Sequence, residues 1–301
     1  MLNKALLTAI LALFLSSALR AQPIEPPDED KIGLSFTTAA TASGKGKLKD
    51  NIATYDDISV RNYSWTLNQH LALDQHRRFS VVLDYDRNEI DAPNSVHVPL
   101  PERLQSLGAS LRYFQIFNPQ WMLSASVGAA SSVTDTGLLS EGWGVRASSM
   151  GIYNKSRQFT FLFGLAFNST SEDLRIVPIL GCDWRPAEKW SIAIGFPRTG
   201  VTYKFSKALS VNLALSGAGG AFYVKDDPRP GIAPRSLADS RLQYLDLRLG
   251  FGCHWKINDT FRISGTVGQL LLRQIKYIDR DYKLRSSGTT PFLSLSGTLS
   301  L

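Results

Sequence analysis

The sequence predicts an all-β protein: a transmembrane antiparallel up-and-down β-barrel of about fourteen strands, with twelve as the alternative count. Three observations predict this fold. An export signal opens the chain, apolar and polar residues alternate with a period of two along most of the remainder, and short turns alternate with longer polar loops. Short turns at one rim and longer loops at the other are typical of outer-membrane barrels.

The first 21 residues have the features of a secretory signal peptide. Lys4 precedes a short apolar run, and the segment closes on Ser-Ser-Ala-Leu-Arg-Ala. A charged start, a short apolar core and a small residue at the cut define such signals; an N-terminal membrane anchor is the alternative. We expect a signal peptide over residues 1–21, a periplasmic tether over residues 22–31, and a barrel over residues 32–301 in the outer membrane of a Gram-negative bacterium.

Charge and apolar content argue against two other classes of protein. The formal net charge is +7, but the basic residues are scattered along the chain, so we expect no nucleic-acid partner. After the signal, no uninterrupted apolar run approaches 18 residues, which argues against membrane-spanning helices.

The few metal-binding and redox-active residue types are dispersed. Cys182 and Cys253 both fall on the apolar side of their segments, so we expect small apolar side chains rather than a disulfide. No CxxC spacing occurs and the four histidines are far apart. We therefore expect no metal site and no cofactor.

The strands are predicted from residues that alternate between apolar and polar. The clearest segments are 79–86, 107–113, 159–168 and 245–253, in which every second residue is apolar. Side chains alternate between the two faces of a strand, so each segment presents one apolar and one polar face. In a barrel that spans a membrane, the apolar face contacts lipid and the polar face lines the lumen.

The connections between strands fall into two alternating classes. Six short turns follow strands near residues 74, 118, 154, 185, 206 and 256, and seven longer polar connections separate them, including residues 43–57, 88–102, 225–241 and 279–290. Six turns and seven loops separate fourteen strands. Because this number is even, both ends of the barrel domain should lie at the short-turn rim, which faces the periplasm.

Large aromatic residues gather where the strands meet the short turns, for example on either side of the charged turn in GCDWRPAEKWSIAIGF. Amphipathic rings favour the water–lipid boundary, so these residues are predicted to form a periplasmic aromatic belt. A soluble β-sandwich or barrel also shows a period of two, but it would not gather aromatic residues at one rim. The predicted belt residues are Phe79, Phe117, Trp121, Tyr153, Phe159, Trp184, Trp190, Trp255 and Phe261.

The stretch from Ile176 to Tyr223 resembles an uncharacterised bacterial family of outer-membrane β-barrels, a family with a domain of unknown function. The likeness rests on Pro178, Gly181, Trp184, Trp190, the Gly195-Phe196-Pro197 step, Tyr203 and Gly219-Gly220, and it continues in LDLRLGFGCHWKINDTFRISGTVGQ. The resemblance implies the barrel fold over about half of the chain, and it implies no activity or ligand.

Charged residues on the polar faces are predicted to project into the lumen. They are Asp84, Asp86, Arg112, Arg146, Asp246, Arg248 and Arg262. Asp84 and Arg112 each lie five residues from the belt on neighbouring strands, so we expect them to pair. An ion pair that stabilises the wall is favoured over a charge-selective constriction, because lumen charges need partners whether or not a solute passes.

The best functional hypothesis from sequence is a pore or facilitator for a small solute or an apolar molecule. The alternatives are a non-conducting structural barrel that presents its surface loops and, less favoured, an outer-membrane enzyme. No nucleophile, base and orienting group are found together near the outer rim, so we predict that the protein is not an enzyme. Outer-membrane lipid and, during biogenesis, the barrel-assembly machinery are the expected partners; the sequence leaves the oligomeric state open.

Overall fold

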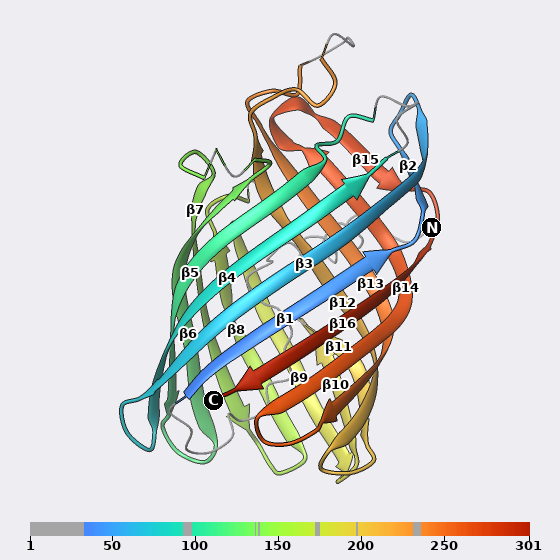
Figure 1. Cartoon of the computed structure of the whole chain (residues 1–301). Coiled ribbons are helices and arrows are strands. Elements are labelled where there is room, and N and C mark those ends of the chain that lie inside the picture. The colour runs from blue at the N-terminus through green and yellow to red at the C-terminus, as the bar shows by residue number, and fades with distance from the viewer. Residues whose placement is uncertain are drawn as a thin grey trace.

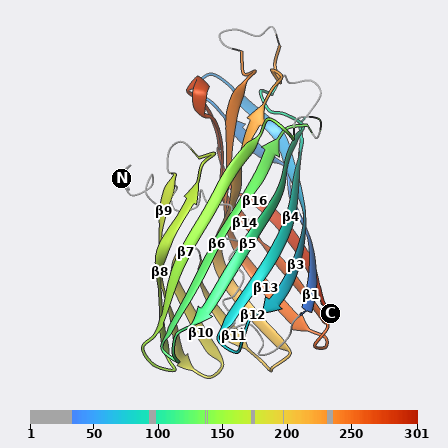
Figure 2. The same cartoon turned by 90° about the vertical axis from the view of Figure 1, so that its left-hand side faces the viewer.

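The computed structural model describes residues 33–92, 98–135, 137, 139–171, 175–196, 198–230 and 236–301, and the predicted signal peptide and tether lie outside these ranges. Within them the chain is antiparallel strand almost throughout, and the strands wind with a strong tilt into one closed barrel (Figures 1 and 2). In the described part of the chain, no helix is both long and apolar enough to cross a bilayer.

The elements follow one another along the chain with few interruptions. They are β1 (Gly33–Ser43), β2 (Gly46–Lys49), β3 (Thr54–Ala72), β4 (Arg77–Asp91), β5 (Arg103–Ile116), β6 (Trp121–Val133), β7 (Trp143–Asn154), β8 (Phe159–Asn168), β9 (Ile176–Ala187), β10 (Trp190–Gly195), β11 (Thr199–Lys204), β12 (Leu209–Val224), β13 (Ser240–Lys256), β14 (Phe261–Tyr277), the 3₁₀ turn η2 (Ile278–Arg280), β15 (Tyr282–Ser286) and β16 (Thr290–Ser300).

The sixteen segments form a barrel of fourteen strands. Each strand from β3 to β14 pairs with the next along the chain, and β1 pairs with both β3 and β16, which closes the ring. The short strand β2 continues β1 and pairs with β3, while β15 leads into β16 and pairs with β14. The predicted closed antiparallel barrel of fourteen strands is therefore confirmed.

Two predicted loops each contain a short strand. Residues 43–57 contain β2, and residues 279–290 contain β15. Their lysines suggest a solvated loop, but Leu48 and Leu284 point inward and are fully buried. Because β3 and β14 extend beyond the ends of β1 and β16, these short strands also supply partners for backbone groups that would otherwise be unpaired.

All six short turns lie where the sequence places them, and five of them share one device. A side-chain oxygen at the start of the turn accepts hydrogen bonds from backbone N–H groups two and three residues later. Such local bonds favour a tight reversal over continued strand. The residues that form this turn are Asp74, Asn118, Ser156, Ser206 and Asn258.

The outer surface of the wall is apolar and the inner surface is largely polar. On β14, Ile263 and Val267 are exposed on the outside, whereas Ser264 and Thr266 face the lumen, where Ser264 bonds Ser296 of β16. Exposed large apolar side chains recur in this phase on nearly every strand, as in Leu83, Leu111, Phe163, Leu180, Leu213, Phe251 and Leu295. A continuous apolar surface of this kind suits contact with acyl chains.

The wall is uneven in height. Strands β10 and β11 have only six residues each, whereas β12 has sixteen. Above Leu215, β12 therefore has no partner on β11; near its outer end Tyr223 instead pairs in parallel with Val133 of β6. The outer part of the barrel is thus narrowed where β6 and β12 meet.

The outward and inward faces should respond differently to charge. We expect Val267→Arg to destabilise the protein in phospholipid vesicles by about 2–4 kcal/mol, because it places a guanidinium among acyl chains at mid-depth. The neighbouring Thr266→Arg should cost much less, because its side chain enters the lumen. Denaturant unfolding of both variants in vesicles measures the difference, and equal costs would contradict the assigned faces.

Candidate functional site in the lumen

One side of the lumen is lined by small hydroxyl groups. Across the closing strands, Thr37 bonds Thr298 at 3.0 Å and Thr41 bonds Ser294 at 2.8 Å. Across β3 and β4, the Asn62 amide donates to Asn88 at 3.1 Å. These bonds satisfy polar, uncharged side chains within the wall.

The structure places the predicted lumen charges among inward-facing neighbours. Asp86 lies opposite Ser64 and Ser106, and Arg146 donates to the hydroxyls of Ser106 and Ser132. Arg262 pairs in register with Thr298 of β16. Directly opposed residues of neighbouring strands point to the same face, so these charged side chains face the lumen.

Asp84 and Arg112 do not pair directly as expected. Asp84 lies opposite Gly108, and Arg112 lies opposite Ser80, so the two charges are offset by four residues along the β4–β5 ladder. They interact electrostatically, but the described residues show no hydrogen bond or ion pair between them. Equal distances from the aromatic belt do not make two residues direct neighbours, because the β4–β5 register sets which residues lie opposite each other. Arg112 remains exposed within the inner half of the lumen.

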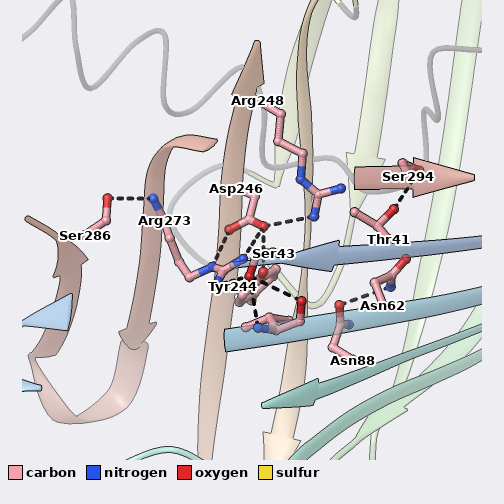
Figure 3. Close-up of polar contacts among 11 residues, drawn as sticks. Thr41, Ser43, Asn62, Asn88, Tyr244, Asp246, Arg248, Arg273, Ser286 and Ser294 are labelled. Atoms are coloured by element: carbon pink, nitrogen blue, oxygen red, sulfur yellow. Dashed lines mark hydrogen bonds and ion pairs between the residues drawn. The ribbon is translucent and has the colours of Figure 1, made fainter. Parts of the chain in front are cut away.

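A charged cluster around Asp246 is the most tightly organised polar feature of the lumen (Figure 3). Asp246 is fully buried. Its carboxylate accepts bonds from Arg273 Nε at 2.8 Å and Nη2 at 3.0 Å, from Arg248 Nη2 at 2.9 Å and from the Tyr244 hydroxyl at 2.7 Å. Arg273 also donates a hydrogen bond to Ser43 on β1. The cluster therefore links β13 and β14 to β1, the strand that closes the barrel.

Arg273 enters the cluster because of a β-bulge. The β13–β14 register shifts after Leu247, which lies opposite Leu272, while Arg248 lies opposite Leu270. The extra residue, Leu271, faces outward and is exposed. A bulge redirects the side chains that follow it, so Arg273 points inward although it shares the parity of the lipid-facing residues before it.

The cluster carries a surplus of positive charge. One carboxylate faces two guanidinium groups, and burial of charges is costly unless they are paired. Arg273 and Asp246 form the buried pair, whereas Arg248 is partly exposed and lies over the ring of Phe292 at 5.7 Å. Arg248 therefore presents the surplus charge toward the lumen.

Above this cluster, buried apolar side chains pack together in the outer part of the barrel. We call this group the outer seal: Leu48, Tyr55, Ile58, Val60, Ile90, Val98, Leu100, Leu104, Phe222, Val224, Leu237, Leu242, Tyr244, Ile275, Tyr277 and Leu284. Most come from inward positions on the strands, while Val98 and Leu100 come from the β4–β5 connection. The Tyr277 hydroxyl donates to the Pro99 carbonyl at 2.8 Å and ties this connection to the wall.

Asp50 holds the outer β2–β3 turn against β15. Its carboxylate accepts bonds from the backbone N–H groups of Ile52 and Ala53 and from the hydroxyls of Tyr55 and Tyr282. Burial by itself would raise the pKa of Asp50, but the Tyr282 hydroxyl and the two amides lower it below its ordinary value. The turn is therefore fixed by an ionised carboxylate at the edge of the outer seal.

A second apolar group lines the lumen on the side of β7–β9. We call it the inner apolar lobe: Met150, Ile152, Ala166, Val177, Ile179 and Phe196. Phe196 comes from the β10–β11 connection, which turns inward at Gly195. A φ of +120° there, with Leu180 O only 2.2 Å from where a Cβ would stand, requires glycine. The Phe196 ring thereby packs against the other residues of the inner apolar lobe.

One histidine lies beside a serine on the lumen face. His70 Nδ1 lies 3.1 Å from Ser80 Oγ, and its Nε2 lies 3.0 Å from the Asn68 amide nitrogen. The described hydrogen-bond partners of His70 include no carboxylate of the kind that orients the histidine in a Ser-His-Asp triad.

The described residues hold no group of three or more His, Cys, Asp or Glu side chains placed to bind a metal ion. Both cysteines are free thiols. Cys253 is exposed on the outer face, and Cys182 is partly exposed.

The predicted belt residues lie at the strand ends next to the short turns. Trp121 pairs with Tyr153 and contacts its ring at 4.6 Å, and Phe159 stacks on Trp184 at 6.1 Å. Trp190 lies opposite Tyr203 with a ring separation of 4.8 Å. Phe79, Phe117, Trp255 and Phe261 occupy the equivalent strand ends elsewhere around the rim.

A family model described as "Domain of unknown function (DUF6268)" matches residues 57–292. This match covers well over half of the chain. The chain belongs to the DUF6268 family. The resemblance expected from residues 176–223 is thereby confirmed, and the DUF6268 match extends it into the first hundred residues. A comparison with curated proteins finds no match.

A solved structure shares the barrel fold of this DUF6268 protein, and two others match more weakly. The "TodX deltaS2S3 mutant monoaromatic hydrocarbon channel" matches with a TM-score of 0.50 at 12% identity, over 90% of this chain and 91% of that chain. The COG4313 outer membrane channel from Pseudomonas putida F1 gives 0.48 at 12% identity, over 92% and 100%. KdgM porin gives 0.41 at 8% identity, over 89% and 99%. At such identities, the likeness to the first concerns the fold alone.

Removing one partner of the buried pair should be costly. We expect Arg273→Met to destabilise the protein by about 3–5 kcal/mol, because Asp246 would keep its charge in a buried site with one guanidinium fewer. The double variant Asp246→Leu, Arg273→Met should recover most of that loss. Arg77→Gln, which breaks the exposed Asp74–Arg77 pair, should change stability by less than about 1 kcal/mol.

Denaturant unfolding of these variants in detergent micelles or vesicles provides the free energies. A double variant as unstable as Arg273→Met alone would show that the pair is not the source of the loss.

Proposed function

We propose that this protein is an outer-membrane facilitator for small, mainly apolar molecules. The observation that carries the proposal is the apolar packing in the outer part of the lumen. The outer seal consists of aliphatic and aromatic side chains, and a second apolar group lines the lumen below it. A hydrophobic constriction excludes hydrated ions by dewetting, whereas an apolar molecule loses little solvation when it enters one.

Location in the outer membrane is part of this proposal. It is supported by the apolar outer face of the wall and by the belt of aromatic rings at the short-turn rim. Short turns on one side and longer connections on the other are the pattern of outer-membrane barrels. The predicted signal peptide agrees with export of the chain.

The Asp246 cluster places charged side chains along the proposed path. A passing molecule that carries one weakly polar or anionic group would meet Arg248, whose guanidinium lies next to the Phe292 ring. The same surplus of positive charge disfavours small cations. The preferred cargo is therefore an apolar molecule that is neutral or bears one anionic or hydrogen-bonding group.

The outer seal should insulate the barrel. In planar lipid bilayers we expect the wild-type protein to pass very little ionic current, and we expect Leu100→Asp to raise it several-fold because a carboxylate in the seal admits water. Ile52→Asp is the matched control, because Ile52 is 86% exposed on an outer turn. Large currents through the wild-type protein would contradict an apolar seal.

The transport proposal is tested in Gram-negative cells that express the protein. We expect faster entry of N-phenyl-1-naphthylamine, an apolar fluorophore, without faster hydrolysis of the polar β-lactam nitrocefin by a periplasmic β-lactamase. Leu100→Asp should reverse this preference, and Ile52→Asp should retain it. Faster nitrocefin entry through the wild-type protein would indicate a hydrated pore, and no change with either probe would indicate a non-conducting barrel.

A further inference from the structure

The short-turn rim carries most of the net positive charge of the chain. The six turns with two residues on either side of each are residues 72–79, 116–122, 152–159, 183–191, 204–210 and 254–262. They contain ten basic residues, Arg77, Arg78, Lys155, Arg157, Arg185, Lys189, Lys204, Lys207, Lys256 and Arg262, and four acidic residues, Asp74, Asp183, Glu188 and Asp259. The resulting charge of +6 compares with a formal net charge of +7 for the whole chain. The net positive charge is therefore concentrated at one end of the barrel.

This charge is concentrated further on three neighbouring hairpins. The turns β3–β4 and β13–β14 neutralise part of their charge internally, through Asp74–Arg77 and Lys256–Asp259 ion pairs. The regions around the turns β7–β8, β9–β10 and β11–β12 together carry six basic residues and two acidic residues, Asp183 and Glu188. We call the six the basic arc: Lys155, Arg157, Arg185, Lys189, Lys204 and Lys207. All six are exposed.

Backbone contacts make the basic arc continuous. The Arg185 N–H donates to the Gln158 carbonyl at 2.8 Å, and the Lys204 N–H donates to the Lys189 carbonyl at 2.8 Å. Each bond joins one turn to the next hairpin. In the described part of the chain, five of the six residues form no ion pair, and Arg185 alone contacts a carboxylate, that of Asp183 at 3.5 Å.

Aromatic rings mark the depth of these cations in the membrane. Trp184, Trp190 and Tyr203 face outward at the ends of the strands, and Tyr203 contacts Phe205 at 4.8 Å. Arg185 and Lys204 alternate with these rings and leave the strands on the lumen side, whereas Lys155, Arg157, Lys189 and Lys207 lie in the turns. Aromatic rings at a membrane interface sit at headgroup depth, so the cations of the turns are at the level of the phosphates.

We propose that the basic arc binds anionic phospholipid headgroups in the leaflet that surrounds the short-turn rim. Long lysine and arginine side chains can extend from the wall toward the headgroups while their stems cover apolar surface. Unpaired cations at this depth attract anionic lipids, and salt screens the attraction. The inference rests on the membrane location proposed above, but it does not depend on which molecule crosses the lumen.

Quenching of tryptophan fluorescence by brominated lipids tests this inference on the full-length mature protein. A background that retains only Trp190 reports on lipids at the basic arc. The protein is folded in two sets of vesicles of equal composition, phosphatidylcholine and phosphatidylglycerol, in which either one lipid or the other carries the bromine atoms. We expect phosphatidylglycerol to be favoured at least about threefold at low salt and the preference to vanish at high salt.

Two charge-matched variants localise the effect. Replacing Lys155, Arg157, Lys189, Lys204 and Lys207 by Gln should abolish the preference. Replacing five outer-rim residues, Lys45, Lys47, Lys49, Arg103 and Arg175, by Gln should preserve it. Gel mobility before and after heating establishes that both variants fold as barrels.

The outcomes separate this inference from the proposed function. Equal quenching by the two lipids in the wild-type protein, or an unchanged preference in the basic-arc variant, would overturn the inference and leave the transport proposal intact. Absence of quenching by either lipid would show that Trp190 does not contact lipid, and the membrane location would fail as well.

Discussion

The structure depends on one constraint: backbone amides and carbonyls in the wall need partners when no water is available. An antiparallel ladder meets this need only if the sheet closes, and β1 closes it by pairing with both β3 and β16. The short strands β2 and β15 extend the same ladder where the main strands stop. The paired backbone in turn fixes which side chains face lipid and which face the lumen.

Within that wall, charged side chains and apolar side chains occupy different levels of the lumen. A carboxylate as buried as Asp246 is tolerated because Arg273, Arg248 and Tyr244 supply bonds to it. Immediately outside it, aliphatic and aromatic side chains pack without charge. A positively charged inner lumen below an apolar outer seal is a poor path for hydrated cations and a better one for apolar molecules, which is the basis of the proposed function.

The alternation of side chains predicted the barrel, the six short turns and the inward-facing charges, because each depends on local sequence. Features that depend on register were missed. Arg273 shares its parity with lipid-facing Val267, and only the bulge at Leu271 turns it inward. The offset of Asp84 from Arg112 likewise follows from strand pairing, which one sequence does not specify. The inward-turning Phe196 had one local signal, the glycine that precedes it.

Accessibility of nitroxide spin labels along β14, in a background without the native cysteines, tests the central claim that apolar faces meet lipid and polar faces meet a lumen. With labels placed singly at residues 262–270 of the protein in vesicles, oxygen collisions should peak at the odd positions and collisions with a water-soluble nickel complex at the even ones. The opposite phase, or collisions with no period of two, would contradict the account.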